Sequence, residues 1–157
     1  MKGRKILTII AAAALISAVG VMAFLIYTLV LRTEYKDTAL QINDVIVANQ
    51  GRAVLRIGEK EAPADDGVTD YYNMFLLNPN TAVYSRKKAA ASDDTAIVLD
   101  FGRYSLSFEK LEDGSATLIT WNTPEKQKQF CVRSQITFMS LLAYGENYFK
   151  KKKLTTP

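Results

Sequence analysis

The sequence predicts an α+β protein: an N-terminal single transmembrane helix, then a small, mostly antiparallel sheet domain covered by a C-terminal amphipathic helix. Three observations predict this fold class. Residues 6–31 carry no charge, residues 96–133 read as short strands separated by turns, and apolar side chains recur at helical spacing after residue 134. The 157-residue chain is long enough for one such domain with one core.

The uncharged N-terminal segment is 26 residues long. As an α-helix it would measure roughly 39 Å, against about 30 Å for the hydrocarbon core of a bilayer. The alternative is a cleaved signal peptide with a small-residue site ending at Ala23. However, the apolar run exceeds the roughly 7–15 residues of an ordinary signal-peptide core. We therefore expect an uncleaved signal anchor over residues 6–31.

Charges beside the anchor predict its orientation. Residues 1–5 form a short basic tail with three bases, whereas the expected linker at 32–36 carries Arg32 and Lys36 with Glu34. Because Lys and Arg favour the cytoplasmic side, we expect a cytoplasmic N-terminus. Residues 37–157 would then form an extracytoplasmic domain at the cell membrane. This domain has 15 bases and 15 acids, so the net charge of +4 gives no reason to expect nucleic-acid binding.

The first half of the domain alternates between strand-like and polar segments. Gly51 favours a hairpin, and Asn78-Pro79-Asn80 is a second turn signature. The expected strands are residues 45–48, 53–57, 72–77 and 81–85, and the expected loops are residues 59–70 and 86–94.

The second half predicts a strand meander followed by a helix. Residues 103–109 alternate between apolar and polar side chains, and Asp113-Gly114 marks a turn. Ser134 is the expected N-cap of the helix, and Lys150 to Lys153 complement its negative pole. The expected strands are residues 96–101, 103–109, 116–121 and 129–133, and the expected buried face of the helix is Phe138, Leu141, Leu142, Gly145, Tyr148 and Phe149.

Candidate binding residues gather beside the acidic loop. Tyr71 and Tyr72 are expected to be the most exposed aromatic pair, whose rings could stack on a sugar or on a partner's apolar patch. Asp65, Asp66 and Asp70 could order the loop around a hard cation, but their spacing lacks the alternating acids of an EF-hand. The plainer interpretations are core aromatics and a solvated acidic loop, so no metal site is predicted.

Composition and motifs argue against catalysis. The chain has no His, the usual side chain for proton transfer near neutral pH and the commonest metal ligand. The single Cys131 excludes an intramolecular disulfide and is expected to face away from the core. Asp100-Phe101-Gly102 matches a kinase tripeptide and Ser85-Arg86-Lys87-Lys88 matches Ser-x-x-Lys, but the companion motifs of both are missing. We therefore expect no catalytic residue, no cofactor and no enzyme activity.

The order of a short basic leader, a long apolar helix and a sheet domain resembles a type IV pilin or minor pseudopilin. In this resemblance Gly3 takes the place of the processing glycine. Arg4 and Lys5 follow it where the pilin pattern has an apolar residue, and no glutamate lies early in the apolar run. The resemblance implies a pilin-like subunit.

These observations predict a membrane-anchored extracytoplasmic protein that binds or assembles with another envelope or membrane protein. The competing function is a small-ligand or glycan-binding module at the cell surface, which would use Tyr71, Tyr72 and the acidic loop. A pilin-like subunit is the third possibility. An aromatic groove would favour the glycan function, whereas an apolar patch or an unpaired sheet edge would favour a protein partner.

Overall fold

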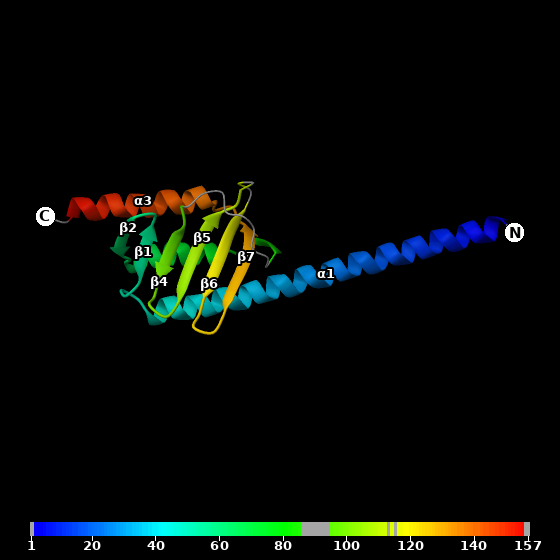
Figure 1. Ribbon diagram of the computed structural model, residues 1–157, viewed down its shortest axis with the longest axis horizontal. Helices are drawn as coiled ribbons and strands as arrows, with labels where there is room; N and C mark the ends of the chain where they lie inside the picture. The colour runs from blue at the N-terminus through cyan, green and yellow to red at the C-terminus, as the bar shows by residue number, and fades with distance from the viewer. Residues whose placement is uncertain (1, 86–94, 113, 115, 156–157) are drawn as a thin grey trace.

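The computed structural model describes residues 2–85, 95–112, 114 and 116–155, with side chains from residue 9 to residue 153. Three helices and seven strands form an α+β fold (Figure 1). The expected loop at residues 86–94 lies outside the described residues. In chain order the elements are α1 (Lys2–Ala48), β1 (Val54–Ile57), β2 (Lys60–Pro63), α2 (Asp66–Leu76), β3 (Ala82–Ser85), β4 (Ile97–Asp100), β5 (Ser105–Lys110), β6 (Thr117–Asn122), β7 (Gln127–Arg133) and α3 (Phe138–Thr155).

Helix α1 runs without a break from the apolar segment into the domain. Its N-terminal half projects as a rod, and its C-terminal half lies along the sheet (Figure 1). Residues 9–27 are exposed, and Leu31 is the first fully buried side chain. The expected linker at 32–36 is therefore helical and contributes to the core. The buried face of α1 consists of Leu31, Tyr35, Thr38, Ala39, Ile42 and Ile46.

The strand expected at residues 45–48 is wrong, because these residues form the last turn of α1. Val45, Ile46 and Val47 are β-branched or strand-favouring, but Ile46 follows Ile42 by four residues and continues the buried helical face. Gly51 has a φ of 71° and reverses the chain after the helix instead of closing a hairpin.

The strand expected at 72–77 is also wrong, since α2 occupies this segment and part of the expected acidic loop. Asp65 is the N-cap, and its side chain accepts a hydrogen bond of 3.0 Å from the backbone N–H of Val68. Val68, Tyr72 and Phe75 then recur at intervals of four and three residues and are buried. This spacing fits a helix and not a strand.

The sheet is antiparallel throughout, in the order β2-β1-β4-β5-β6-β7-β3. The predicted meander from β4 to β7 is confirmed, and residues 82–85 form the predicted strand β3. The β1–β2 hairpin was not predicted; its turn contains Gly58 with a φ of 57°. Strands β2 and β3 are the two edges, and only β2 carries charged side chains on its four residues.

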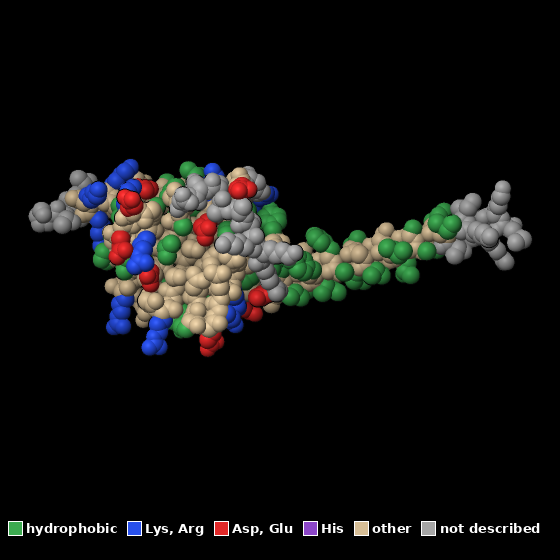
Figure 2. Space-filling view, viewed as in Figure 1, with side chains coloured by type: hydrophobic (Ala, Val, Ile, Leu, Met, Phe, Trp, Pro, Cys, Tyr) green, Lys and Arg blue, Asp and Glu red, His purple; other side chains and the backbone are tan. Residues whose placement is uncertain are grey.

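The helices cover one face of the sheet and leave the other face open. The apolar side chains of alternating sheet positions, such as Leu106, Phe108, Ile119 and Trp121, pack beneath the helices in one core. Polar uncharged side chains occupy the centre of the open face, over β5, β6 and β7, and form the broad tan area of Figure 2. These residues are Ser105, Ser107, Thr120, Asn122, Gln127 and Gln129. On the side of β1, β2 and β4 the same face carries the ion pairs of Arg56 with Glu61 and Asp100.

Cys131 lies on the side of β7 opposite to Phe130 and Val132, but it does not lie in a polar environment. Its side chain is 5% exposed and packs with Leu111 and Leu118 in a small separate cluster. The thiol is therefore part of a second apolar contact on the open side of the sheet.

The predicted C-terminal helix is present as α3, but Ser134 does not cap it. The Thr137 hydroxyl accepts a hydrogen bond of 3.3 Å from the Ser140 backbone N–H and is the capping group. Ser134 Oγ instead accepts from the Asn78 side-chain amide at 3.1 Å. Phe138, Leu141, Tyr148 and Phe149 are buried as the helical spacing predicts.

Gly145 allows α3 to approach the sheet closely. A Cβ at this position would clash with Ile57 and would lie 2.6 Å from the Tyr72 hydroxyl oxygen. We expect Gly145→Ala to lower the free energy of unfolding by about 1–3 kcal/mol, because overpacking outweighs the better helix propensity of Ala. Gly67→Ala is the matched control: its nearest neighbour would be the Asp65 carboxylate at 3.5 Å, so we expect it to be stabilising by up to about 1 kcal/mol. Equal effects in urea denaturation would contradict the close approach.

Candidate binding surfaces

The five predicted site residues all lie at the start of α2. Asp65 caps the helix, and Asp66 lies in its first turn, where a carboxylate is stabilised by the positive pole of the helix. Asp70 follows one turn later. Asp66 and Asp70 are exposed, and neither forms an ion pair with the described residues. The start of α2 is therefore an anionic surface.

The described geometry gives no support for a hard-cation site at these acids. Within the part of the chain that the structure describes, no group of three or more His, Cys, Asp or Glu side chains could hold a metal ion. The carboxylate of Asp65 is engaged by the Val68 N–H, which accounts for its position without a cation.

Tyr72 is buried, so the expectation of an exposed Tyr71–Tyr72 pair is wrong. Its side chain is 0% exposed, and its hydroxyl donates a hydrogen bond of 3.1 Å to the backbone carbonyl of Leu141. Burial, and then the neighbouring Tyr71 and Tyr144, raise the pKa of Tyr72 well above that of a free tyrosine. Tyr72 thus joins α2 to α3 inside the core.

Tyr71 is half-buried and pairs with a tyrosine that the sequence analysis did not select. The rings of Tyr71 and Tyr144 are stacked, with centroids 3.7 Å apart and planes 11° apart. The Tyr144 hydroxyl donates to the carbonyl of Gly67 at 3.2 Å. Partial burial and then the negative charge of Asp65 raise the pKa of Tyr144. The stack holds α3 against α2. Its sequence signal was the spacing of Tyr144 from Leu141 and Tyr148, by three and four residues.

Further along α2 the anionic surface meets exposed apolar side chains. Met74 is 64% exposed and Leu77 is 42% exposed, in line with Asp66 and Asp70 on the outer side of the helix. They line a groove of about 540 Å³ that we call the α2 groove. Its lining consists of Asp70, Asn73, Met74, Leu77, Asn78, Pro79 and Ile136.

The α2 groove combines hydrogen-bond acceptors with apolar walls. The side-chain amide of Asn73 donates to the Asn43 side chain at 2.7 Å. The side-chain oxygen Oδ1 of Asn73 is buried without a hydrogen-bond partner. The Asp70 carboxylate lies at the same groove. This combination suits a segment that brings both an apolar side chain and a cationic donor.

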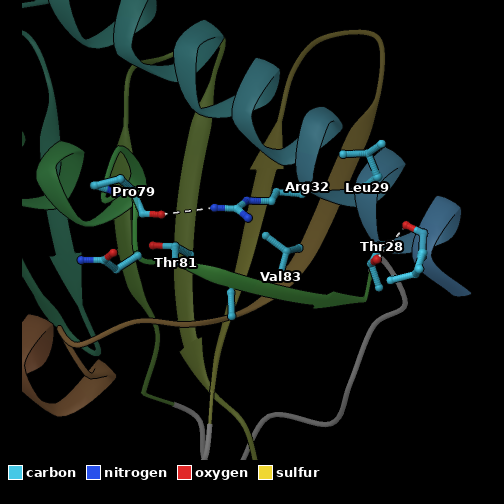
Figure 3. Close-up of a pocket in the computed structure, with 9 residues that line it drawn as sticks. Thr28, Leu29, Arg32, Pro79, Thr81 and Val83 are labelled. Atoms are coloured by element: carbon cyan, nitrogen blue, oxygen red, sulfur yellow. Dashed lines mark hydrogen bonds between the residues drawn. The ribbon is translucent and has the colours of Figure 1, made fainter.

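A second hollow, the junction pocket, lies where the exposed apolar part of α1 meets the domain (Figure 3). Its volume is about 670 Å³, and it lies between one face of α1 and the chain leading into β3. Figure 3 shows Arg32 reaching from α1 toward the carbonyl of Pro79, which it contacts at 3.5 Å. The lining consists of Leu25, Thr28, Leu29, Arg32 and residues 79–83.

The open sheet face is a third surface, but its side chains bind one another. Gln129 donates to Thr120 at 3.2 Å, and Asn122 donates to Ser105 at 3.0 Å across the strands. Gln127 in turn donates to Asn122 at 2.8 Å. These cross-strand hydrogen bonds satisfy much of the polar surface, so it offers fewer open groups to a ligand than the α2 groove does.

The chain matches no protein-family model, no curated protein and no solved structure. By length and composition α1 can cross a membrane, a property that a signal sequence shares.

Proposed function

We propose that this chain is a single-pass protein of the cell membrane, with a cytoplasmic N-terminus, whose domain binds another membrane protein of the envelope and catalyses no reaction. The continuity of α1 is the observation that carries the proposal. Because the apolar segment and the core share one helix, the domain has no flexible linker and stays at the bilayer surface.

The length of α1 limits the reach of the domain. Residues 31–48 span about 26 Å at the usual helical rise, and the sheet lies alongside them (Figure 1). The surfaces that lie beside these residues of α1 are therefore within about that distance of the membrane, and they include the α2 groove, where Asn73 bonds to Asn43 of α1. A partner embedded in the membrane, or held at its surface, meets this requirement.

The α2 groove is the docking surface that we assign to this partner. Exposed Met74 and Leu77 offer apolar contact, and Asp66 and Asp70 offer negative charge that no described cation neutralises. The complementary partner segment carries apolar side chains next to an Arg or Lys. Charge complementarity supports a protein partner over a neutral glycan at this groove.

Co-purification tests this function. We expect the tagged full-length chain, extracted in mild detergent, to bring down a membrane protein in stoichiometric amount. Met74→Glu and Asp70→Lys should each reduce its recovery by about tenfold or more, since a central apolar anchor or a paired charge contributes about 1–3 kcal/mol. Val47→Glu is the matched control, because Val47 is 57% exposed on α1 outside the groove. Protease added to intact cells should remove the domain.

Other results of the co-purification experiment would favour other functions. Copies of this chain alone, after crosslinking, would favour the pilin-like subunit, which the continuous α1 also supports. Recovery of the monomer alone would remove the assembly function. A glycan would then be the next ligand to test, at the half-buried rings of Tyr71 and Tyr144.

A further inference from the structure

The lining of the junction pocket changes from apolar at one end to cationic and polar at the other, as a phospholipid changes from acyl chain to headgroup. Along α1 its wall changes from apolar Leu25 and Leu29 to the cationic Arg32, within two turns of helix. The opposite wall changes from Val83 and Ala82 to the polar Asn80 and Thr81. Apolar groups thus lie toward the exposed helix, and polar groups lie toward the domain (Figure 3).

The position of this change along α1 matches the edge of a bilayer. Residues 9–30 of α1 measure about 33 Å, close to the roughly 30 Å of a hydrocarbon core. Arg32 follows directly and would lie at the level of the lipid headgroups. The lysines at the end of α3 lie at the opposite end of the molecule (Figure 1), so Arg32 is the base placed to meet a headgroup in this pocket.

Two polar side chains of the pocket have unused hydrogen-bonding capacity. The guanidinium of Arg32 makes one long contact, 3.5 Å to the Pro79 carbonyl, and no ion pair with the described carboxylates. Thr81 is only 6% exposed, and its hydroxyl has no hydrogen-bond partner. A buried hydroxyl without a partner is unfavourable, and a phosphate oxygen would accept from both groups.

We propose that the junction pocket binds one phospholipid of the surrounding membrane. The phosphate lies between Arg32 and Thr81, and an acyl chain lies along Leu25, Leu29 and Val83. The lipid fills the angle between α1 and β3 and fixes the domain against the bilayer. This inference rests on the membrane anchoring proposed above, and it is independent of the protein partner.

Native mass spectrometry of the full-length protein in mild detergent tests the site. We expect one co-purified phospholipid per chain. Arg32→Gln should weaken its retention about tenfold, the effect of losing one charge-assisted hydrogen bond. Lys36→Gln is the matched control, because Lys36 is an exposed base one turn later that does not line the pocket. Equal retention in wild type and Arg32→Gln, or equal loss in both variants, would overturn the proposal.

Thr81→Val separates lipid binding from folding. In lipid-free detergent this variant should melt at or above the wild-type temperature, because it removes an unpartnered buried hydroxyl. Its lipid retention should nevertheless fall. Added dioctanoyl phosphatidylglycerol should raise the melting temperature of wild type but not of Arg32→Gln. An equal rise with inorganic phosphate alone would show a free-anion site and overturn the lipid assignment.

Different experimental results would contradict the membrane anchor and the lipid site. If alkaline carbonate washes the wild-type protein off membranes, the membrane anchor is wrong and the lipid site falls with it. If the protein stays in the membrane pellet but retains no phospholipid, only the lipid site is wrong.

Discussion

A fragment that begins at Asp37 is expected to be about 5 kcal/mol less stable to unfolding than a fragment that begins at Thr28. The shorter fragment lacks Leu31 and Tyr35, which are 0% and 6% exposed in the full chain. Burying one such side chain contributes about 1.5–3 kcal/mol. Tyr35 also donates to the Leu76 carbonyl at 3.1 Å and meets the Phe130 ring edge-on at 5.4 Å.

A loss of this size is decisive for a small domain. Typical domains are stable by about 5–15 kcal/mol, so the loss of residues 28–36 should remove about a third or more of the stability of residues 37–157. Urea denaturation followed by the fluorescence of the single, buried Trp121 would measure the difference. Equal midpoints for the two fragments would show that residues 28–36 of α1 are dispensable for stability.

Point substitutions in the full chain give the control for truncation. Tyr35→Ala should cost about 3–4 kcal/mol, because it removes a buried ring and its hydrogen bond. Lys36→Ala, at the exposed neighbouring position, should change stability by less than about 0.5 kcal/mol. Because Ala is the best helix former, helix propensity cannot account for a loss at either position, and similar losses at both would mean that the burial of Tyr35 does not determine the effect.

The domain boundary could not be predicted because the charge pattern and the burial pattern disagree at the same residues. Arg32, Glu34 and Lys36 indicate a solvated linker, yet they belong to a helix whose inner side buries Leu31 and Tyr35. A linker and an amphipathic turn have the same composition over five residues. Only the contact with a sheet that forms much later in the chain distinguishes them.

The meander was predictable because its signals are local. Tyr104, Leu106 and Phe108 alternate with polar residues, and each turn has its own Gly or Pro. By contrast, the first turn of α2 contains Gly67, Val68 and Thr69, which are poor helix formers, so propensity favoured a strand at the end of this segment. Its N-cap Asp65 was the correct signal, but an acidic loop contains the same residue.

The candidate sites were predictable only in part. The exposed acids and Tyr71 were found from their positions beside a polar segment. The partner of Tyr71, Tyr144, comes from α3, more than 70 residues away, and Arg32 and Thr81 are joined only by the packing of α1 on β3. Such pairings depend on topology, which residue spacing alone does not supply.

Strong alkali is expected to unfold the domain through two buried tyrosines. Burial raises the pKa of both Tyr35 and Tyr72 above the value of about 10 that a tyrosine has in an unfolded chain. Above pH 10 the unfolded chain loses these protons while the folded domain keeps them. The contribution of the two tyrosines to the free energy of unfolding is therefore fully present below about pH 10. It falls as the pH rises, by about 1.4 kcal/mol per pH unit for each tyrosine.

The two tyrosines together would remove about 4 kcal/mol by pH 11.5, much of the stability of a typical domain. Tyrosinate absorbance and circular dichroism, recorded together from pH 9 to 12, should show part of the tyrosine signal ionising only as the structure is lost. Smooth ionisation of all eight tyrosines with unchanged circular dichroism would contradict this coupling.

Conservative variants attribute the pH dependence to particular residues. Tyr35→Phe keeps the buried ring but removes the ionisable hydroxyl, so the stability lost per pH unit should fall by about half. The variant should be slightly less stable at neutral pH, because the bond to the Leu76 carbonyl is absent, and yet resist alkali better. Tyr84→Phe is the matched control, because this side chain is 47% exposed on the edge strand β3. The wild type and both variants share all their other ionisable side chains, so a difference in slope between wild type and Tyr35→Phe reports the buried hydroxyl.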